Sequence, residues 1–234
     1  MRCREKHSDF KSNRRLAVAG IKKLCIGMII LGACMFLLAG SFFYWNVWLY
    51  TVSLFISIFA MGVYLYRNDQ ELLKKRLNSK EKEKAQKGYG LITGFALLGS
   101  FIVCGLDYRF GWSKVPIIVV LVALTTMMSG FLLFAVTLVQ NSFASRTIEI
   151  QDKQVVIDTG VYSKVRHPLY SAAIVMFFMS PFVLGSFYAV IPSIFYIVAI
   201  ILRIRNEEEV LCKGLDGYEN YLHRVKYRLI PYVW

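Results

Sequence analysis

Residues 24–66 read LCIGMIILGACMFLLAGSFFYWNVWLYTVSLFISIFAMGVYLY, a stretch of 43 residues without Asp, Glu, Lys or Arg. A helix needs about 20 apolar residues to cross the hydrocarbon core of a bilayer, so this stretch is about twice as long as one crossing requires. The chain must therefore turn back on itself. We expect the turn around Gly40, Ser41 and Tyr44-Trp45-Asn46, because aromatic and amide side chains suit the headgroup boundary. The stretch predicts two membrane spans.

Four further apolar runs follow along the chain. The third span is expected at 88–106 and the fourth at 115–145, with its most apolar part between Pro116 and Val139. Two shorter runs come after Pro168, one ending at Leu184 and one covering 186–202. A helix of about 17 residues is roughly 25 Å long, near the lower limit for crossing. We therefore predict an all-α polytopic membrane protein with about six membrane segments, the last two forming a short helical hairpin.

The positive charges flank these runs. Eight Lys and Arg residues lie in 1–23, eight in 67–87, four in 140–167 and six from Arg203 onward. The positive-inside rule then places both termini on the cytoplasmic side, in the inner (plasma) membrane if the source is bacterial. The net charge of +13 suits attraction to anionic lipid. Nucleic-acid binding is disfavoured, because the cations flank spans instead of forming an aromatic-interleaved patch.

The cysteine and histidine residues predict neither disulfide bonds nor a metal site. The five cysteines are scattered without a C-x-x-C pair, and the three histidines are too dispersed for a metal cluster. We expect neither a disulfide framework nor a bound metal.

Two soluble stretches divide the chain. We expect an N-terminal membrane region at 1–140, with four spans and a basic cytoplasmic loop at 67–87 that forms a solvated helix or linker. The second region, 141–234, begins with a different kind of segment. Apolar residues at 147–150 and 154–157 flank the polar 151–153, which suggests a small β-hairpin-like loop before the last two segments.

The end of the last segment carries alternating charge. Arg203 is four residues before Glu207, and Glu207-Glu208-Glu209 places three carboxylates together. An exposed helix end in water is one explanation. If the last two segments form a hairpin, however, Arg166, His167 and Tyr170 face Glu207 and Glu208. The resulting pocket would suit a zwitterionic or cationic small ligand beside a lipidic one.

These residues also carry a resemblance to a known family. The sequence from Gly160 to Tyr170 (GVYSKVRHPLY), followed by Arg203-Ile204, Glu207-Glu208 and Leu211, resembles the isoprenylcysteine carboxyl methyltransferase and phospholipid methyltransferase superfamily. The resemblance covers about 145–234. The tail shares it through these residues: Gly217, Tyr218, Tyr221, Val225, 227–231 and Trp234. Residues 1–140 resemble the family only as a generic set of spans.

The resemblance implies an integral membrane methyltransferase that uses S-adenosylmethionine and a lipophilic methyl acceptor within the bilayer. The cofactor-binding residues that it implies are Tyr162, His167, Pro168, Tyr170, Glu207 and Glu208, and the catalytic residues are Arg166, Arg203 and Glu207. The chemistry is compatible, because carboxylates stabilise the cofactor's sulfonium and ammonium groups while arginine, imidazole and tyrosine donors can meet its carboxylate and adenine.

Other functions stay open at this point. The acceptor could instead be a phospholipid amine or a small thiol, and the chain could be a noncatalytic membrane module or a carrier. A soluble cofactor-binding fold is disfavoured, because the nearest glycine pattern, Gly88-Tyr89-Gly90 with Gly94, follows a charged run instead of a strand.

Overall fold

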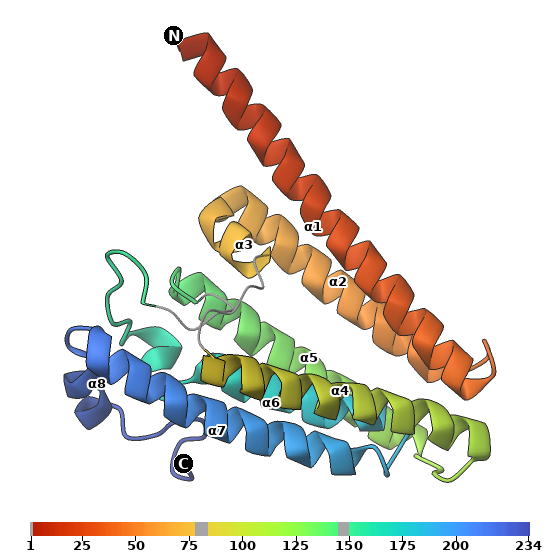
Figure 1. Cartoon of the computed structure of the whole chain (residues 1–234). Helices are drawn as coiled ribbons and strands as arrows, with labels where there is room; N and C mark the ends of the chain where they lie inside the picture. Colours follow the sequence, from red (N-terminus) through yellow and green to blue (C-terminus); the bar gives the residue numbers. More distant parts are fainter. Residues whose placement is uncertain (1, 78–83, 145–149) are drawn as a thin grey trace.

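The chain forms a bundle of helices whose long members run side by side (Figure 1). The computed structural model describes residues 2–77, 84–144 and 150–234. The helices are α1 (Arg2–Ala39), α2 (Trp45–Asn68), α3 (Gln70–Leu77), α4 (Lys84–Phe110), α5 (Ile117–Gln140), the 3-10 helix η1 (Gly160–Ser163), α6 (Pro168–Val183), α7 (Val190–Gly214) and α8 (Tyr218–Arg224). These described ranges contain no β-strand, in agreement with the predicted all-α class.

Within the described residues, four helices are long and apolar enough to cross a membrane. They are the Arg15–Ala39 part of α1, α2, the Gly88–Phe110 part of α4, and α5. The expected turn between the first two spans lies at residues 40–44. The structure therefore supports four of the roughly six predicted membrane segments. Helix α6 has 16 residues, about 24 Å, which is shorter than the ~30 Å hydrocarbon core.

Helices α5 and α6 pack closely because a glycine stands where they meet. A Cβ at Gly130 would lie 2.9 Å from Cγ of Met176 and 3.3 Å from the carbonyl oxygen of Ala172. Only a residue without a side chain allows this approach, as at other helix contacts within membranes. Helix α7 packs against both α6 and α4. This packing fixes the last two helices side by side with their connecting residues, 184–189, at one end of the bundle.

Polar contacts join the loops at that end. The carboxylate of Asp107, which is 1% exposed, accepts hydrogen bonds from the backbone N–H and the hydroxyl of Ser113, both at 2.6 Å, and from the hydroxyl of Ser186. Asn46 donates to the carbonyl of Val183 at 2.8 Å, and the hydroxyl of Tyr44 donates to the carbonyl of Leu184. We call this set of contacts the loop clasp. It ties together the α1–α2, α4–α5 and α6–α7 connections.

The two soluble stretches differ from expectation. In the basic loop, α3 is not simply solvated: Leu72 and Leu73 are buried against Leu65 and Leu138, because adjacent leucines give the short helix one apolar face. Residues 78–83 lie outside the described residues. The first arm of the predicted β-hairpin also falls largely outside them, at 145–149. Its turn is present, with the N–H of Gln154 donating to the carbonyl of Gln151 at 3.1 Å, but 150–157 forms no strand.

Candidate functional site

The two predicted motifs meet where α6 begins and α7 ends. Pro168 is the first residue of α6. An N–H at this position would have no acceptor within the helix, so the missing N–H of proline costs no hydrogen bond. Helix α7 runs back along α6, so its charged second half lies beside that start. A cavity opens there, and seven of the predicted residues line it: Tyr162, Arg166, His167, Pro168, Tyr170, Arg203 and Glu207.

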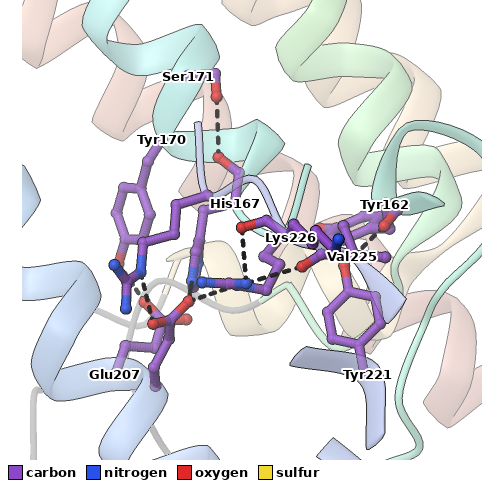
Figure 2. Close-up of polar contacts among 11 residues, drawn as sticks. Tyr162, His167, Tyr170, Ser171, Glu207, Tyr221, Val225 and Lys226 are labelled. Carbon is purple, nitrogen blue, oxygen red and sulfur yellow. Dashed lines mark hydrogen bonds and ion pairs between the residues drawn. The ribbon is translucent and has the colours of Figure 1, made fainter. Parts of the chain in front are cut away.

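The tail after α8 holds the start of α6 in place. The backbone N–H groups of Arg166 and His167 donate to the carbonyls of Tyr227 and Arg228, both at 2.9 Å. The hydroxyl of Ser171 donates to the carbonyl of Leu229 at 2.7 Å, and Figure 2 shows Ser171 beside His167 at this start of α6. The acceptors of these bonds are backbone carbonyls of the tail. In these contacts, the position of the start of α6 therefore depends on the path of the tail backbone and not on the side chains of the tail.

Glu208 is the buried carboxylate on which two arginines and a histidine converge. Its two oxygens accept from Nε of Arg166 at 2.7 Å, Nε of Arg228 at 2.8 Å and Nε2 of His167 at 3.2 Å. The residue is 6% exposed. Burial opposes its ionisation, but the hydrogen bonds and charges of His167, Arg228 and Arg166 outweigh it and lower the pKa of Glu208 to about 2. The carboxylate is therefore ionised at neutral pH. Because Glu208 is buried, the alternative interpretation of this segment as a helix end exposed to water does not apply to it.

Arg166 is held by the same cluster. Its Nη1 donates to the carbonyls of Val225 at 2.8 Å and Lys226 at 3.1 Å, in addition to the bond from Nε to Glu208. Figure 2 shows Val225 and Lys226 of the tail beside this group. The guanidinium thus joins α7 to the tail while lining the cavity.

Glu207 takes part in a second chain of contacts, on the cavity side. The hydroxyl of Tyr170 donates to Oε2 of Glu207 at 2.7 Å and accepts from Nε of Arg203 at 2.9 Å. Figure 2 shows Tyr170 pointing from α6 toward Glu207. All three residues line the cavity. A carboxylate, a phenol and a guanidinium therefore lie in sequence along one wall.

Tyr162 forms the opposite part of the lining. Its hydroxyl accepts from Nδ2 of Asn141 at 3.0 Å, and its carbonyl accepts from the hydroxyl of Tyr221 at 2.7 Å, as Figure 2 shows for Tyr221. Burial raises the pKa of Tyr162 to about 12, although the bond from Asn141 opposes the change. The phenol keeps its proton at neutral pH and can donate it to a bound ligand.

Some residues of the site were not predicted from sequence, and one predicted residue lies elsewhere. Asn141, Tyr218 and Tyr221 line the cavity, although a span-end amide and tail tyrosines gave little chemical signal by themselves. Arg228, which was not among the predicted site residues, binds Glu208. Glu208 itself does not line the cavity and lies behind it, among Arg166, His167 and Arg228.

The comparison with protein families supports the predicted resemblance. Residues 118–213 match the family model described as the isoprenylcysteine carboxyl methyltransferase family. The match contains η1, α6 and nearly all of α5 and α7, and so includes both motifs, whereas the tail from 214 onward lies outside it. No curated protein matches the chain. The matched region and the four apolar helices support a membrane methyltransferase of this type.

Proposed function

We propose that this chain, a member of the isoprenylcysteine carboxyl methyltransferase superfamily, transfers a methyl group from S-adenosylmethionine to a lipophilic acceptor at the cytoplasmic face of the membrane. The observation that carries the proposal is the cavity between the start of α6 and the end of α7. It places Glu207, Tyr170 and Arg203 together beside apolar residues such as Leu169 and Leu211.

The donor set fits the cofactor. S-adenosylmethionine carries a sulfonium, an ammonium, a carboxylate and an adenine. Glu207 supplies negative charge for the cationic groups, and Tyr162, His167 and Tyr170 supply donors or ring faces for the rest. Pro168 lines the same cavity. The cavity measures about 130 Å³, below the ~300 Å³ at which ligand pockets usually begin. We therefore expect the coil at 154–157, which lines it, to move outward on binding.

Two of the predicted roles change with the geometry. Glu208 and Arg166 bind one another and the tail, so we assign them the positioning of His167 and the start of α6. Arg203 and Glu207, which share Tyr170 between them, are the candidates for contact with the reacting groups. In this arrangement Arg203 also offsets the charge of Glu207.

When bound, the cofactor supplies an electrophilic methyl group: the bond from sulfur to methyl breaks as a bond from the acceptor to methyl forms, and S-adenosylhomocysteine is released. Such an in-line displacement depends chiefly on orientation and exclusion of water. A carboxylate or thiolate acceptor needs no strong base, whereas an amine acceptor must first lose a proton.

Calorimetric titration of the purified protein with S-adenosylhomocysteine tests the cofactor site. We expect binding that weakens about 10- to 100-fold in Glu207→Gln, because hydrogen bonds to charged groups contribute about 1.5–3 kcal/mol. His167→Ala should weaken it as well. The matched control is Glu209→Gln, which removes the same charge from an exposed neighbour that does not line the cavity. Absence of binding, or equal effects of Glu207→Gln and Glu209→Gln, would refute the proposal.

A second experiment identifies the acceptor. Membranes containing the protein are supplied with S-adenosylmethionine labelled in its methyl group, and the labelled product is identified. A lipid-soluble product agrees with the proposal. A methylated small thiol, or no product that depends on the intact chain, contradicts it.

A further inference from the structure

Residues 230–233 of the tail form a turn that is both apolar and exposed. Ile230 is 55% exposed, Tyr232 88% and Val233 74%. Pro231, between them, is exposed as well. Contiguous apolar surface of this kind is unfavourable in water and marks places where a protein meets another protein or a membrane. The composition of the turn therefore suits an apolar surrounding.

The turn lies beside the membrane-spanning part of the bundle. Figure 1 shows the C-terminus next to α7 instead of beyond α8. Leu229 and Trp234, which flank the turn, belong to one apolar cluster with Ile200 of α7 and Ala96 of α4. Ala96 is eight residues from the start of the apolar part Gly88–Phe110 of α4, which is about 12 Å along the helix. The flanking residues thus pack at a depth that lies inside the bilayer.

The backbone of the turn bonds to itself. Two carbonyl oxygens accept its N–H groups: that of Trp234 accepts from Arg228, Leu229 and Ile230 at 2.9, 2.9 and 3.1 Å, and that of Ile230 accepts from Val233 and Trp234 at 3.1 and 3.2 Å. Pro231 has no N–H to satisfy. Non-helical backbone is tolerated at membrane depth only where its polar groups have partners in the protein. This pattern lowers the cost of placing the turn among lipids.

The polar groups near the turn suit the headgroup region. Tyrosine is favoured at the boundary between headgroups and hydrocarbon, and the exposed Lys226 can meet lipid phosphates. Tyr232 also has φ of 65°, a left-handed conformation that is uncommon for residues other than glycine. Such strain persists where the surroundings compensate it. Within the protein the ring of Tyr232 meets that of Tyr227, with 5.2 Å between centres, and lipid would supply the remaining contacts.

We propose that residues 230–233 form a wedge that inserts into the lipid leaflet on the cavity side of the membrane. The side chains of Ile230 and Val233 lie among the acyl chains, and the hydroxyl of Tyr232 lies at the level of the headgroups. The partner of this surface is the bilayer itself, and the inference does not depend on which molecule is methylated.

The wedge is connected directly to the candidate site. The guanidinium of Arg228 lies 5.0 Å from the ring centre of Trp234, and its Nε binds Glu208 at 2.8 Å. The backbone N–H groups of Arg166 and His167 donate to carbonyls of the same tail. Insertion of the wedge therefore holds the tail in the path that positions the start of α6. Contact with lipid thus stabilises the site from outside the bundle.

Photocrosslinking tests the insertion without requiring catalysis. The variant Tyr232→p-benzoylphenylalanine keeps an aromatic ring at the tip of the wedge. The full chain is placed in phosphatidylcholine nanodiscs that hold one chain each, irradiated, and analysed by mass spectrometry. We expect an adduct with the mass of one phospholipid, bonded through an acyl chain.

Two exposed residues serve as matched controls for the crosslinker. Phe95→p-benzoylphenylalanine, in the apolar part of α4, should give the same adduct, whereas His223→p-benzoylphenylalanine, in α8, should give no lipid adduct. Absence of a lipid adduct at Tyr232 where Phe95 forms one would overturn the inference. The Tyr232 variant is also irradiated in intact membranes, where a protein adduct in place of the lipid adduct would overturn it as well.

Hydrogen exchange in nanodiscs tests the connection to the site. The double variant Ile230→Ser, Val233→Ser removes the apolar groups of the wedge. The N–H groups of Arg166 and His167 should then exchange about tenfold faster, because their acceptors lie on the tail and local opening depends on few contacts. The measurement needs no cofactor, so its outcome is independent of the proposed function.

Val198→Ser is the matched control for the double variant. Val198 is an exposed residue of α7, and its substitution also removes an apolar side chain from the surface. Exchange at Arg166 and His167 should stay within about twofold of the unmodified protein, because this residue does not hold the tail. Unchanged exchange in the double variant, or equal acceleration in Val198→Ser, would overturn the connection between the wedge and the site.

Discussion

At the scale of single residues, two adjacent glutamates of α7 have different surroundings. Successive residues on a helix point about 100° apart, which allows Glu207 and Glu208 to meet different partners. Glu208 is surrounded by Arg166, His167 and Arg228, whereas Glu207 meets the hydroxyl of Tyr170 at the cavity. The pair therefore divides into a carboxylate that holds the site together and one that can contact a ligand.

The environment of Glu208 predicts a specific dependence of stability on pH. Its pKa is about 2 in the folded protein, below its ordinary value near 4.3. A carboxylate with a lowered folded pKa stabilises the fold above its unfolded pKa, and this contribution is lost as the pH falls toward 2. Glu208→Gln should therefore unfold at a lower temperature at pH 7 and lose less stability between pH 5 and pH 3 than the unmodified protein.

Thermal unfolding in detergent, followed at several pH values, measures this difference. Removing one partner of a buried ion pair typically costs about 3–5 kcal/mol, so the change at pH 7 should be clear. Glu209→Gln, at an exposed residue of the same helix, should keep the pH profile of the unmodified protein. Parallel pH profiles for Glu208→Gln and the unmodified protein would contradict the assignment.

At the scale of elements, the 3-10 helix η1 connects the end of α5 to the cavity. Gly160 opens it with φ of 57°, a left-handed conformation that costs other residues about 1–2 kcal/mol. A Cβ at Gly160 would collide with Oε1 of Gln140, the atom that accepts from the N–H of Val161. The glycine thus allows both the backbone conformation and the contact between α5 and η1.

Gly160→Ala should consequently weaken cofactor binding as well as stability. The added methyl group would displace Gln140, and η1 would no longer hold Tyr162 at its present place. Gly217→Ala is the matched control, because Gly217 also has a positive φ, 81°, but a Cβ added there would meet no atom within 4 Å. We expect both variants to lose unfolding temperature, Gly160→Ala the more, and only Gly160→Ala to bind S-adenosylhomocysteine more weakly. Equal affinities in titration would show that the contact with Gln140 has no role in binding.

The elements also show what sequence can and cannot predict here. The turn near Gly40 and the start of α6 at Pro168 were predicted, because a long uncharged run and a proline act through local chemistry. The burial of Leu72 and the path of the tail were not, since they depend on contacts between distant segments. The same reason explains Glu208: its type and spacing marked the site, but only the packed tail shows that Arg228 binds it.

At the scale of the whole molecule, the cavity and the loop clasp lie at opposite ends of the bundle. Figure 1 shows α8 at one end and the α1–α2 and α4–α5 connections at the other. The clasp joins those connections to residues 184–189 between α6 and α7. The loop clasp therefore fixes the relative position of α6 and α7, the two helices that bear the motifs. None of the residues of the clasp lines the cavity.

Asp107→Ala should destabilise the fold while leaving the cofactor site of the folded molecules unchanged. The substitution leaves the donors of Ser113 and Ser186 without their carboxylate acceptor, and each buried polar group without a partner costs about 1–3 kcal/mol. For a protein of this size we expect the unfolding temperature to fall by about 5 °C or more. Asp107→Asn keeps one acceptor oxygen and should have an intermediate effect. Titration with S-adenosylhomocysteine below the unfolding temperature should give an affinity within twofold for both variants, because the substituted residue lies at the far end of α4. An affinity that falls in proportion to stability would instead show that the clasp sets the geometry of the cavity through α6 and α7.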